Sequence, residues 1–277
     1  MSAPEVVAHR GVTAEAPEHT LSAYRGAAAV GADAVECDVR MTRDGVLVCV
    51  HDRQISHTSD GRGIVSALHL DELEQFHFGP RRSTGRGRWA GDEITAVRDE
   101  PDVESGLVLT LERLLDYITA SPGTVRLAIE TKHPTRHAHK VEEALVACLQ
   151  RYGLLHDGTP VQWAGRPAVR MMSFSQLAVR RMGDLAPGVP TVQLIGKRLR
   201  PVRRELLQSG ATAVGPRITL LRSDPEYVAD AHAAGKEVHV WTVNEAADMD
   251  LARELGVDVV VTDRPDELLR RLGRGTR

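Results

Sequence analysis

Eight short apolar runs, separated by amphipathic stretches, constrain the fold of this chain more than any other feature of its sequence. Each run is four to six residues long and resembles a buried strand, because β-branched side chains are frequent in it. The alternation of such runs with helical patterns predicts βα units and a parallel sheet. The expected strands are Val6–His9, Ala34–Val39, Arg126–Glu130, Val169–Ser173, Thr191–Ile195, Thr212–Gly215, Glu237–Trp241 and Asp258–Thr262.

The helical patterns and the chain length favour a closed barrel. Eight βα units within 277 residues suit a (β/α)8 TIM barrel better than an open doubly wound sheet. No GxGxxG motif follows the first run and no GxxxxGK[ST] motif occurs, which disfavours nucleotide-binding α/β folds. We expect a single TIM-barrel domain over residues 1–277, with helices at His19–Val30, Thr110–Ala120, His137–Arg151 and Pro225–Ala234.

One connection is too long for an ordinary βα loop. An insertion at about residues 53–109 follows the second strand and contains clusters of Gly, Arg and Ser, with one candidate helix at Ser66–Phe76. The second βα loop belongs to the catalytic face of a barrel. We expect a lid that influences substrate choice, with a disordered excursion as the alternative.

The charge balance argues against nucleic acid as a partner. The chain has 35 basic and 38 acidic side chains, so its formal charge is close to neutral. The run from Arg81 to Arg88 is a local basic exception. It is interpreted as a solvated loop, with contact to an anionic ligand as the alternative.

Cysteine use and the absence of apolar spans favour a cytoplasmic protein. Cys37, Cys49 and Cys148 lack CxxC spacing, so we expect buried thiols and no disulfides. The N-terminal sequence has neither a basic leader nor a long apolar stretch. No segment reaches membrane-spanning length without charge, so we expect no integral membrane segment. The oligomeric state is left open by the sequence.

Carboxylates stand at the ends of two expected strands. Glu36 and Asp38 are two residues apart on a strand, so both point to one face, the barrel interior. Two carboxylates this close repel each other unless a cation or a proton lies between them. A divalent cation with oxygen ligands, Mg²⁺ or Ca²⁺, is the expected solution, with arginine partners as the alternative. Glu130 is expected as a third carboxylate, and Lys132 lies on the same face to meet an anionic oxygen.

Two histidines stand at neighbouring strand exits. His9 is followed by Arg10 and His51 is followed by Asp52. Histidines in such positions are suited to general acid and base catalysis, and the planar guanidinium of an arginine is suited to phosphate oxygens. Together with the carboxylates, His9, His51 and Arg10 indicate phosphodiester chemistry at a metal ion.

Other polar and aromatic residues at loops and strand ends are candidates as well. His133, His137 and His139 lie in a loop and helix start and are expected to face mostly solvent. Trp241 ends a strand, where it either contacts a ligand or packs in the core. Asp263 precedes the last helix and is expected to cap it.

The order of these motifs along the chain resembles that of the glycerophosphodiester phosphodiesterases. The resemblance spans almost the whole chain, and it is the ordered set of motifs that makes it specific. The shared motifs are His9-Arg10-Gly11, Pro17-Glu18-His19-Thr20, Glu36-x-Asp38, Asp44-Gly45, His51-Asp52, Leu111-Glu112, Glu130-x-Lys132, Ser173-Phe174, Trp241-Thr242-Val243-Asn244 and Thr262-Asp263-Arg264-Pro265.

The resemblance implies a TIM barrel with one bound divalent cation that hydrolyses glycerophosphodiesters to glycerol 3-phosphate and an alcohol. It implies that His9 and His51 are the acid and base. The implied metal ligands are Glu36, Asp38 and Glu130, and the implied substrate contacts are Arg10 and Lys132.

Two readings besides this one stay open at this point. One is a lysophospholipase D-like phosphodiesterase on the same barrel, and the other is a non-catalytic barrel that binds phosphate esters. The family usually has asparagine where this chain has His19. The identity of the leaving alcohol, the choice between Mg²⁺ and Ca²⁺ and the effect of His19 are left open by the sequence.

Overall fold

The protein forms a closed barrel of eight parallel strands. The structure, a computed structural model, describes residues 3–79, 106–121, 123, 125–137, 139–196 and 210–274. Each barrel strand pairs in parallel with its neighbours, and β1 pairs with both β13 and β2, which closes the ring. The predicted TIM barrel is therefore confirmed. Its strands are β1 (Glu5–His9), β2 (Ala34–Met41), β4 (Arg126–Thr131), β9 (Val169–Ser173), β10 (Thr191–Ile195), β11 (Ala213–Pro216), β12 (Glu237–Val240) and β13 (Val259–Thr262).

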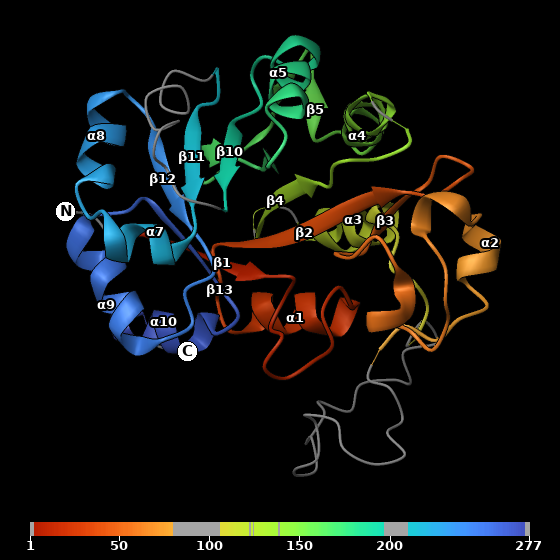
Figure 1. Cartoon of the computed structure of the whole chain (residues 1–277), viewed down its shortest axis with the longest axis horizontal. Coiled ribbons are helices and arrows are strands. Elements are labelled where there is room, and N and C mark those ends of the chain that lie inside the picture. Colours follow the sequence, from red (N-terminus) through yellow and green to blue (C-terminus); the bar gives the residue numbers. More distant parts are fainter. Residues whose placement is uncertain are drawn as a thin grey trace.

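Helices surround the barrel (Figure 1). They are α1 (Leu21–Ala29), α3 (Leu111–Ala120), α4 (Lys140–Arg151), α5 (Gln176–Leu185), α7 (Ile218–Ser223), α8 (Tyr227–Ala233), α9 (Ala246–Leu255) and α10 (Pro265–Arg271). The four predicted helices are present, and each begins one to three residues later than expected. The start of α1 has a local cause, since the Thr20 side chain accepts a hydrogen bond from the Ala23 amide and caps the helix there. No helix in the described part of the chain is long and apolar enough to cross a membrane.

Side-chain alternation along β2 separates the core from the barrel interior. Val35, Cys37 and Val39 lie in the apolar cluster between the sheet and its helices, as the alternation predicts. The inward-facing Ala34 belongs to a separate cluster inside the barrel. All three cysteines are buried and free, which confirms the expectation of thiols. Inward-facing positions nearer the carboxyl end of β2 are thus left for polar side chains.

The chain leaves the barrel after β2. Strand β3 (Leu47–Cys49) pairs antiparallel with the end of β2, and η1 (Ile55–His57), η2 (Val65–Ala67) and α2 (Leu70–Leu73) follow it. These elements lie at the end of the molecule opposite α8 in Figure 1, and they enclose a small apolar cluster of their own.

The continuous helix expected at Ser66–Phe76 is wrong in extent. Leu68 adopts an extended backbone and ends η2. Helix α2 then begins separately, because the Glu72 side chain accepts a hydrogen bond from the His69 amide. The basic run from Arg81 to Arg88 lies outside the described residues. The lid role of residues 53–109 stays a prediction.

An ionic cluster occupies the amino-terminal end of the barrel. Glu5 is buried, and its carboxylate lies 3.0 Å from a guanidinium nitrogen of Arg126 and 3.0 Å from one of Arg166. Arg170 also pairs with it. A buried carboxylate with several charge-assisted partners is a structural arrangement, so the chemistry is sought at the carboxyl ends of the strands.

A second ionic contact ties the end of the chain to the barrel. Both terminal nitrogens of Arg274 lie 2.7 Å from the carboxylate of Asp33, which also accepts the Val6 amide at 2.8 Å. Burial acts to raise the pKa of Asp33, but the hydrogen bonds from Arg274 and Val6 outweigh it and lower the pKa from its ordinary 3.8.

We expect Asp33→Asn to lower the free energy of unfolding by about 1 kcal/mol at pH 7, because it removes a bidentate, partly exposed ion pair. A lowered folded-state pKa means that this stabilisation is present above pH 3.8 and is lost as the pH falls through the folded-state pKa. Urea unfolding at pH 7 and pH 3 measures both effects. The control Asp266→Asn removes an exposed pair with Arg270 and should change stability by less than about 0.5 kcal/mol. Equal stability of the two variants at pH 7 would contradict the prediction.

Candidate active site

Strand register brings three carboxylates together at the barrel mouth. His9 of β1 is paired with Glu36 of β2, and Asp38 of β2 is paired with Glu130 of β4. Ligand oxygens of Glu36, Asp38 and Glu130 all lie within 4.8 Å of one another. All three side chains are buried. The three residues predicted from the sequence to be metal ligands therefore lie close together in the structure.

The carboxylates strongly influence one another. Burial and the charge of Asp38 raise the pKa of Glu36, and the same two causes raise the pKa of Glu130 to about 7. Burial opposes ionisation of Asp38 as well, but a hydrogen bond from His19 and the charges of Lys132 and Arg10 lower its pKa. Asp38 is thus the anionic centre of the group, whereas the two glutamates need a further positive charge to ionise fully.

Two permanent cations lie against this group. Arg10 Nε is 3.0 Å from Asp38 Oδ2, and Lys132 Nζ is 2.8 Å from Asp38 Oδ1 and 2.7 Å from Glu130 Oε1. An arginine partner, which the sequence analysis gave as the alternative to a cation, is therefore present beside these carboxylates. Arg10 also pairs with Glu18, whose Oε2 lies 2.8 Å from Arg10 Nη1. Three buried carboxylates outnumber these two cations, and an all-oxygen donor set fits a hard divalent ion.

A strained turn after β1 places Arg10. The backbone φ is +58° at Arg10 and +89° at Gly11. A Cβ at position 11 would lie 2.6 Å from the backbone of Ala23 in α1, so only glycine fits there. The turn also directs the Arg10 amide to Glu36 Oε2, 3.1 Å away. The His-Arg-Gly sequence thus folds so that both the amide and the guanidinium of Arg10 meet carboxylates of β2.

His19 is a buried partner of Asp38, a role that the sequence did not assign. Its Nε2 lies 3.0 Å from Asp38 Oδ2, and its Nδ1 lies 2.8 Å from the Tyr24 hydroxyl. Burial lowers the pKa of His19, so the ring is neutral. The contact with an ionised Asp38 places the proton on Nε2, which leaves Nδ1 to accept from Tyr24. Its φ of +58° is a conformation that asparagine and histidine adopt more readily than most residues.

His9 is oriented by the residue that directly follows the last strand of the barrel. Its Nδ1 lies 2.7 Å from Asp263 Oδ1, and Asn244 Nδ2 donates to Asp263 Oδ2 at 2.5 Å. The expectation that Asp263 caps the final helix is wrong, because the N-cap of α10 is Arg264 without a side-chain cap bond. The missed signal is alternation: Asp263 follows the inward-facing Val259 and Val261 at the same spacing.

His51 is held next to Asp38 through its backbone. The Val50 amide donates to the Asp38 carbonyl at 3.0 Å, and Arg40 donates to the His51 carbonyl through Nε at 3.0 Å and Nη2 at 2.7 Å. The His51 ring pairs through Nδ1 with Asp52 Oδ1 at 2.8 Å. Arg40 was not among the predicted site residues, although it continues the face of Glu36 and Asp38 along β2.

Burial lowers the pKa of His51. The charges of Lys132 and Arg10 act in the same direction, and Asp38 and Asp52 oppose them. His51 is therefore a neutral imidazole at neutral pH. Its Nδ1 is engaged by Asp52, which leaves Nε2 as the nitrogen available for proton transfer.

The other residues singled out in the sequence differ in their surroundings. His133 is not solvent-facing as expected, because its Nε2 pairs at 2.7 Å with the fully buried Glu142, whereas His139 is exposed. Trp241 donates through Nε1 to the Gly215 carbonyl at 2.7 Å and packs against the cluster inside the barrel. Its ring also packs edge-on against the exposed Phe174 ring, with the two ring centroids 5.4 Å apart. Core packing of Trp241 is thus present, and its contact with substrate stays a prediction.

The chain is similar to known proteins over nearly its full length. Residues 9–267 match the sequence profile of the glycerophosphoryl diester phosphodiesterase family. A Mycobacterium tuberculosis protein named "Probable glycerophosphodiester phosphodiesterase 1" is 41% identical over 95% of this chain and 90% of its own. The glycerophosphodiester phosphodiesterase of Bacillus subtilis is 31% identical over 94% of this chain and 83% of its own.

A solved structure shares the fold. An Oleispira antarctica phosphodiesterase, described in complex with the product sn-glycerol-3-phosphate, has a TM-score of 0.78 and 24% identity. The match covers 98% of this chain and 97% of that one.

The contacts of His19 predict a graded loss of stability on substitution. We expect His19→Ala to lower the free energy of unfolding by about 3 kcal/mol, because it removes a donor to a buried carboxylate and puts alanine at a positive φ that histidine and asparagine adopt more readily. His19→Asn should lose less than half of that, since asparagine tolerates the backbone and offers an amide donor. Denaturant unfolding of the metal-free protein measures both.

His139→Ala is the matched control for a lost histidine, because His139 is exposed and its contact with Glu143 is 3.8 Å long. Its stability should stay within about 0.5 kcal/mol of the wild type. An asparagine variant as unstable as the alanine variant would refute the role given to His19.

Proposed function

The chain belongs to the glycerophosphoryl diester phosphodiesterase family, and from this premise we propose that it hydrolyses glycerophosphodiesters to sn-glycerol 3-phosphate and an alcohol. The observation that carries the proposal is the placement of two histidines, each paired with a carboxylate, beside a buried three-carboxylate group at the barrel mouth. The names of the relatives and the product held by the Oleispira antarctica enzyme support the same substrate class.

We infer that Glu36, Asp38 and Glu130 hold one divalent cation, Mg²⁺ or Ca²⁺. Their buried, mutually repelling oxygens support this assignment. Such an ion, when bound, supplies positive charge that offsets the charge of the phosphodiester in its transition state. Arg10 and Lys132 lie against the same carboxylates, and we assign their remaining donors to the phosphate oxygens of the substrate.

His51 is assigned as the base and His9 as the acid. The neutral His51 ring takes a proton from the attacking oxygen as that oxygen forms its bond to phosphorus. His9, held by Asp263, gives a proton to the alcohol oxygen as the bond between this oxygen and phosphorus breaks. The attacking oxygen is either water or the 2-hydroxyl of the substrate glycerol, which first gives a cyclic phosphate; ³¹P NMR of the reaction distinguishes the two.

Substitution of either histidine tests the assignment. We expect His9→Ala and His51→Ala each to lower kcat on glycerophosphocholine by roughly 10²- to 10⁴-fold, the range for loss of a general acid or base. The p-nitrophenyl ester of sn-glycerol 3-phosphate separates the roles, because p-nitrophenolate leaves without needing a proton. His9→Ala should regain activity on this ester and His51→Ala should not.

Retention of near wild-type turnover by both variants would refute the histidine mechanism. Recovery by His51→Ala alone would reverse the two roles. His139→Ala, which removes an exposed histidine, is the control and should keep wild-type kcat.

Removal of the ion should abolish turnover. We expect EDTA-stripped protein to lose activity and to regain it with Mg²⁺ or Ca²⁺, and calorimetry to measure one ion per chain. Because the pKa of Glu130 is about 7 without the ion, a proton competes below that pH, and ion affinity should rise as the pH increases from 6 to 8. Glu130→Gln should weaken ion binding and flatten this pH dependence.

Chelator-insensitive activity would refute the metal assignment. A Glu130→Gln variant that binds the ion with wild-type affinity would remove Glu130 from the ligand set. Glu143→Gln, on the exposed face of α4, is the control for loss of a carboxylate.

A further inference from the structure

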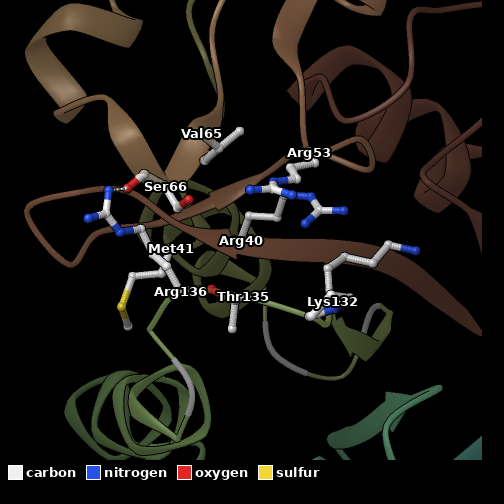
Figure 2. A pocket seen from close by; sticks show the side chains of 9 residues that line it. Arg40, Met41, Arg53, Val65, Ser66, Lys132, Thr135 and Arg136 are labelled. Carbon is white, nitrogen blue, oxygen red and sulfur yellow. Dashed lines mark hydrogen bonds between the residues drawn. The ribbon is translucent and has the colours of Figure 1, made fainter.

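A basic pocket, shown in Figure 2, adjoins the carboxylate group of the barrel mouth through Lys132. Its volume is about 180 Å³, and its walls come from the end of β2, the segment after β3 and the loop between β4 and α4. Four of its nine lining residues are cationic: Arg40, Arg53, Lys132 and Arg136. None of the nine is acidic or aromatic. The pocket is therefore built for negative charge.

Three of these cations have no carboxylate partner among the described residues. Arg53 is exposed. Burial lowers the pKa of the neighbouring Arg40 and the charge of Arg53 acts in the same direction, whereas the charges of Asp38, Asp52 and Glu130 oppose them. Two nitrogens of Arg40, Nε and Nη2, donate to the His51 carbonyl, and Nη1 has no partner in the described part of the chain. Among the described residues, Arg136 donates only to the Ser66 carbonyl, at 3.3 Å, as the dashed line in Figure 2 marks. Clustered arginines repel one another, and an anion relieves that repulsion.

The pocket and the catalytic group share a wall. Lys132 lines the pocket, and its ammonium reaches Asp38 and Glu130. Arg40 lies two residues after Asp38 on the same face of β2, about 7 Å further along the strand. The pocket is therefore within reach of a substituent on a phosphate bound at the carboxylate group.

We propose that this pocket is the subsite for the leaving alcohol and that it selects alcohols carrying a carboxylate or a second phosphate. The inference rests on the proposed function and adds the substrate class to it. A quaternary ammonium such as choline is bound by aromatic faces or carboxylates, which the pocket lacks. An acyl chain is disfavoured as well, because it would take guanidinium groups out of water without offering them an acceptor.

A matched series of substrates tests the selection. The series consists of sn-glycerol 3-phosphate diesters of glycerol, glyceric acid, glycerol phosphate and choline, which differ mainly in the charge of the alcohol. The anion preference is defined as kcat/KM for the glyceric acid diester divided by kcat/KM for the glycerol diester. We expect a wild-type preference of about fivefold, with the choline diester as the poorest of the four.

Variants of the two exposed arginines connect the preference to the pocket. Arg53→Gln and Arg136→Gln should each lower the anion preference by about twofold, and the double variant should bring it close to one. Arg136→Lys keeps the charge and should retain most of the preference. Arg180→Gln, which removes an exposed arginine from the outer helix α5, should leave the preference at its wild-type value.

The outcomes separate this inference from the proposed function. If no diester is hydrolysed, the proposed function fails. If the glycerol diester is hydrolysed but the anion preference is near one, or is unchanged in the double variant, only the subsite fails. Inorganic phosphate provides the last arm: it should inhibit hydrolysis of the glycerol diester by the wild type more strongly than by Arg136→Gln, and equal inhibition of the two proteins would mean that Arg136 does not bind an anion and would overturn the inference.

Discussion

Asp38 is the charge on which the arrangement of the mouth depends. It is buried on the second barrel strand and is contacted by Arg10, His19 and Lys132, which come from three different segments of the chain. A buried carboxylate is tolerable only with such partners, so its ionisation and their positions are fixed together. The turn after β1, the loop before α1 and the end of β4 are therefore held in one geometry by a single side chain.

Much of the fold and part of the site could be predicted from one rule, the alternation of side chains along a strand. It placed Glu36 and Asp38 on the interior face and Val35, Cys37 and Val39 under the helices, and the structure agrees. Applied further along the same strands, the rule would also have placed Arg40 and Asp263 inward. Both were missed because a charged residue near a strand end has a plausible local role, capping or solvation, that needs no partner.

Other contacts had no signal in the sequence. The role of His19 depends on a left-handed backbone and on a strand that follows it in the chain, and neither is visible in residue spacing. The helix expected at Ser66–Phe76 failed for a similar reason, since an extended Leu68 within an amphipathic pattern gives no periodic signature. Pairing across the fold decides such features, and pairing is known only when the register of the strands is known.

The partnership of His9 with Asp263 has a consequence for how the enzyme comes into being. His9 ends the first strand of the barrel and Asp263 directly follows the last, 254 positions away, and these strands meet only when the ring closes. A ribosome-bound chain that has already produced the three carboxylates and both histidines still lacks the group that orients one of them. We therefore expect the active site to become complete late in synthesis, at the moment when the ring closes. It should not form gradually as its residues leave the ribosome.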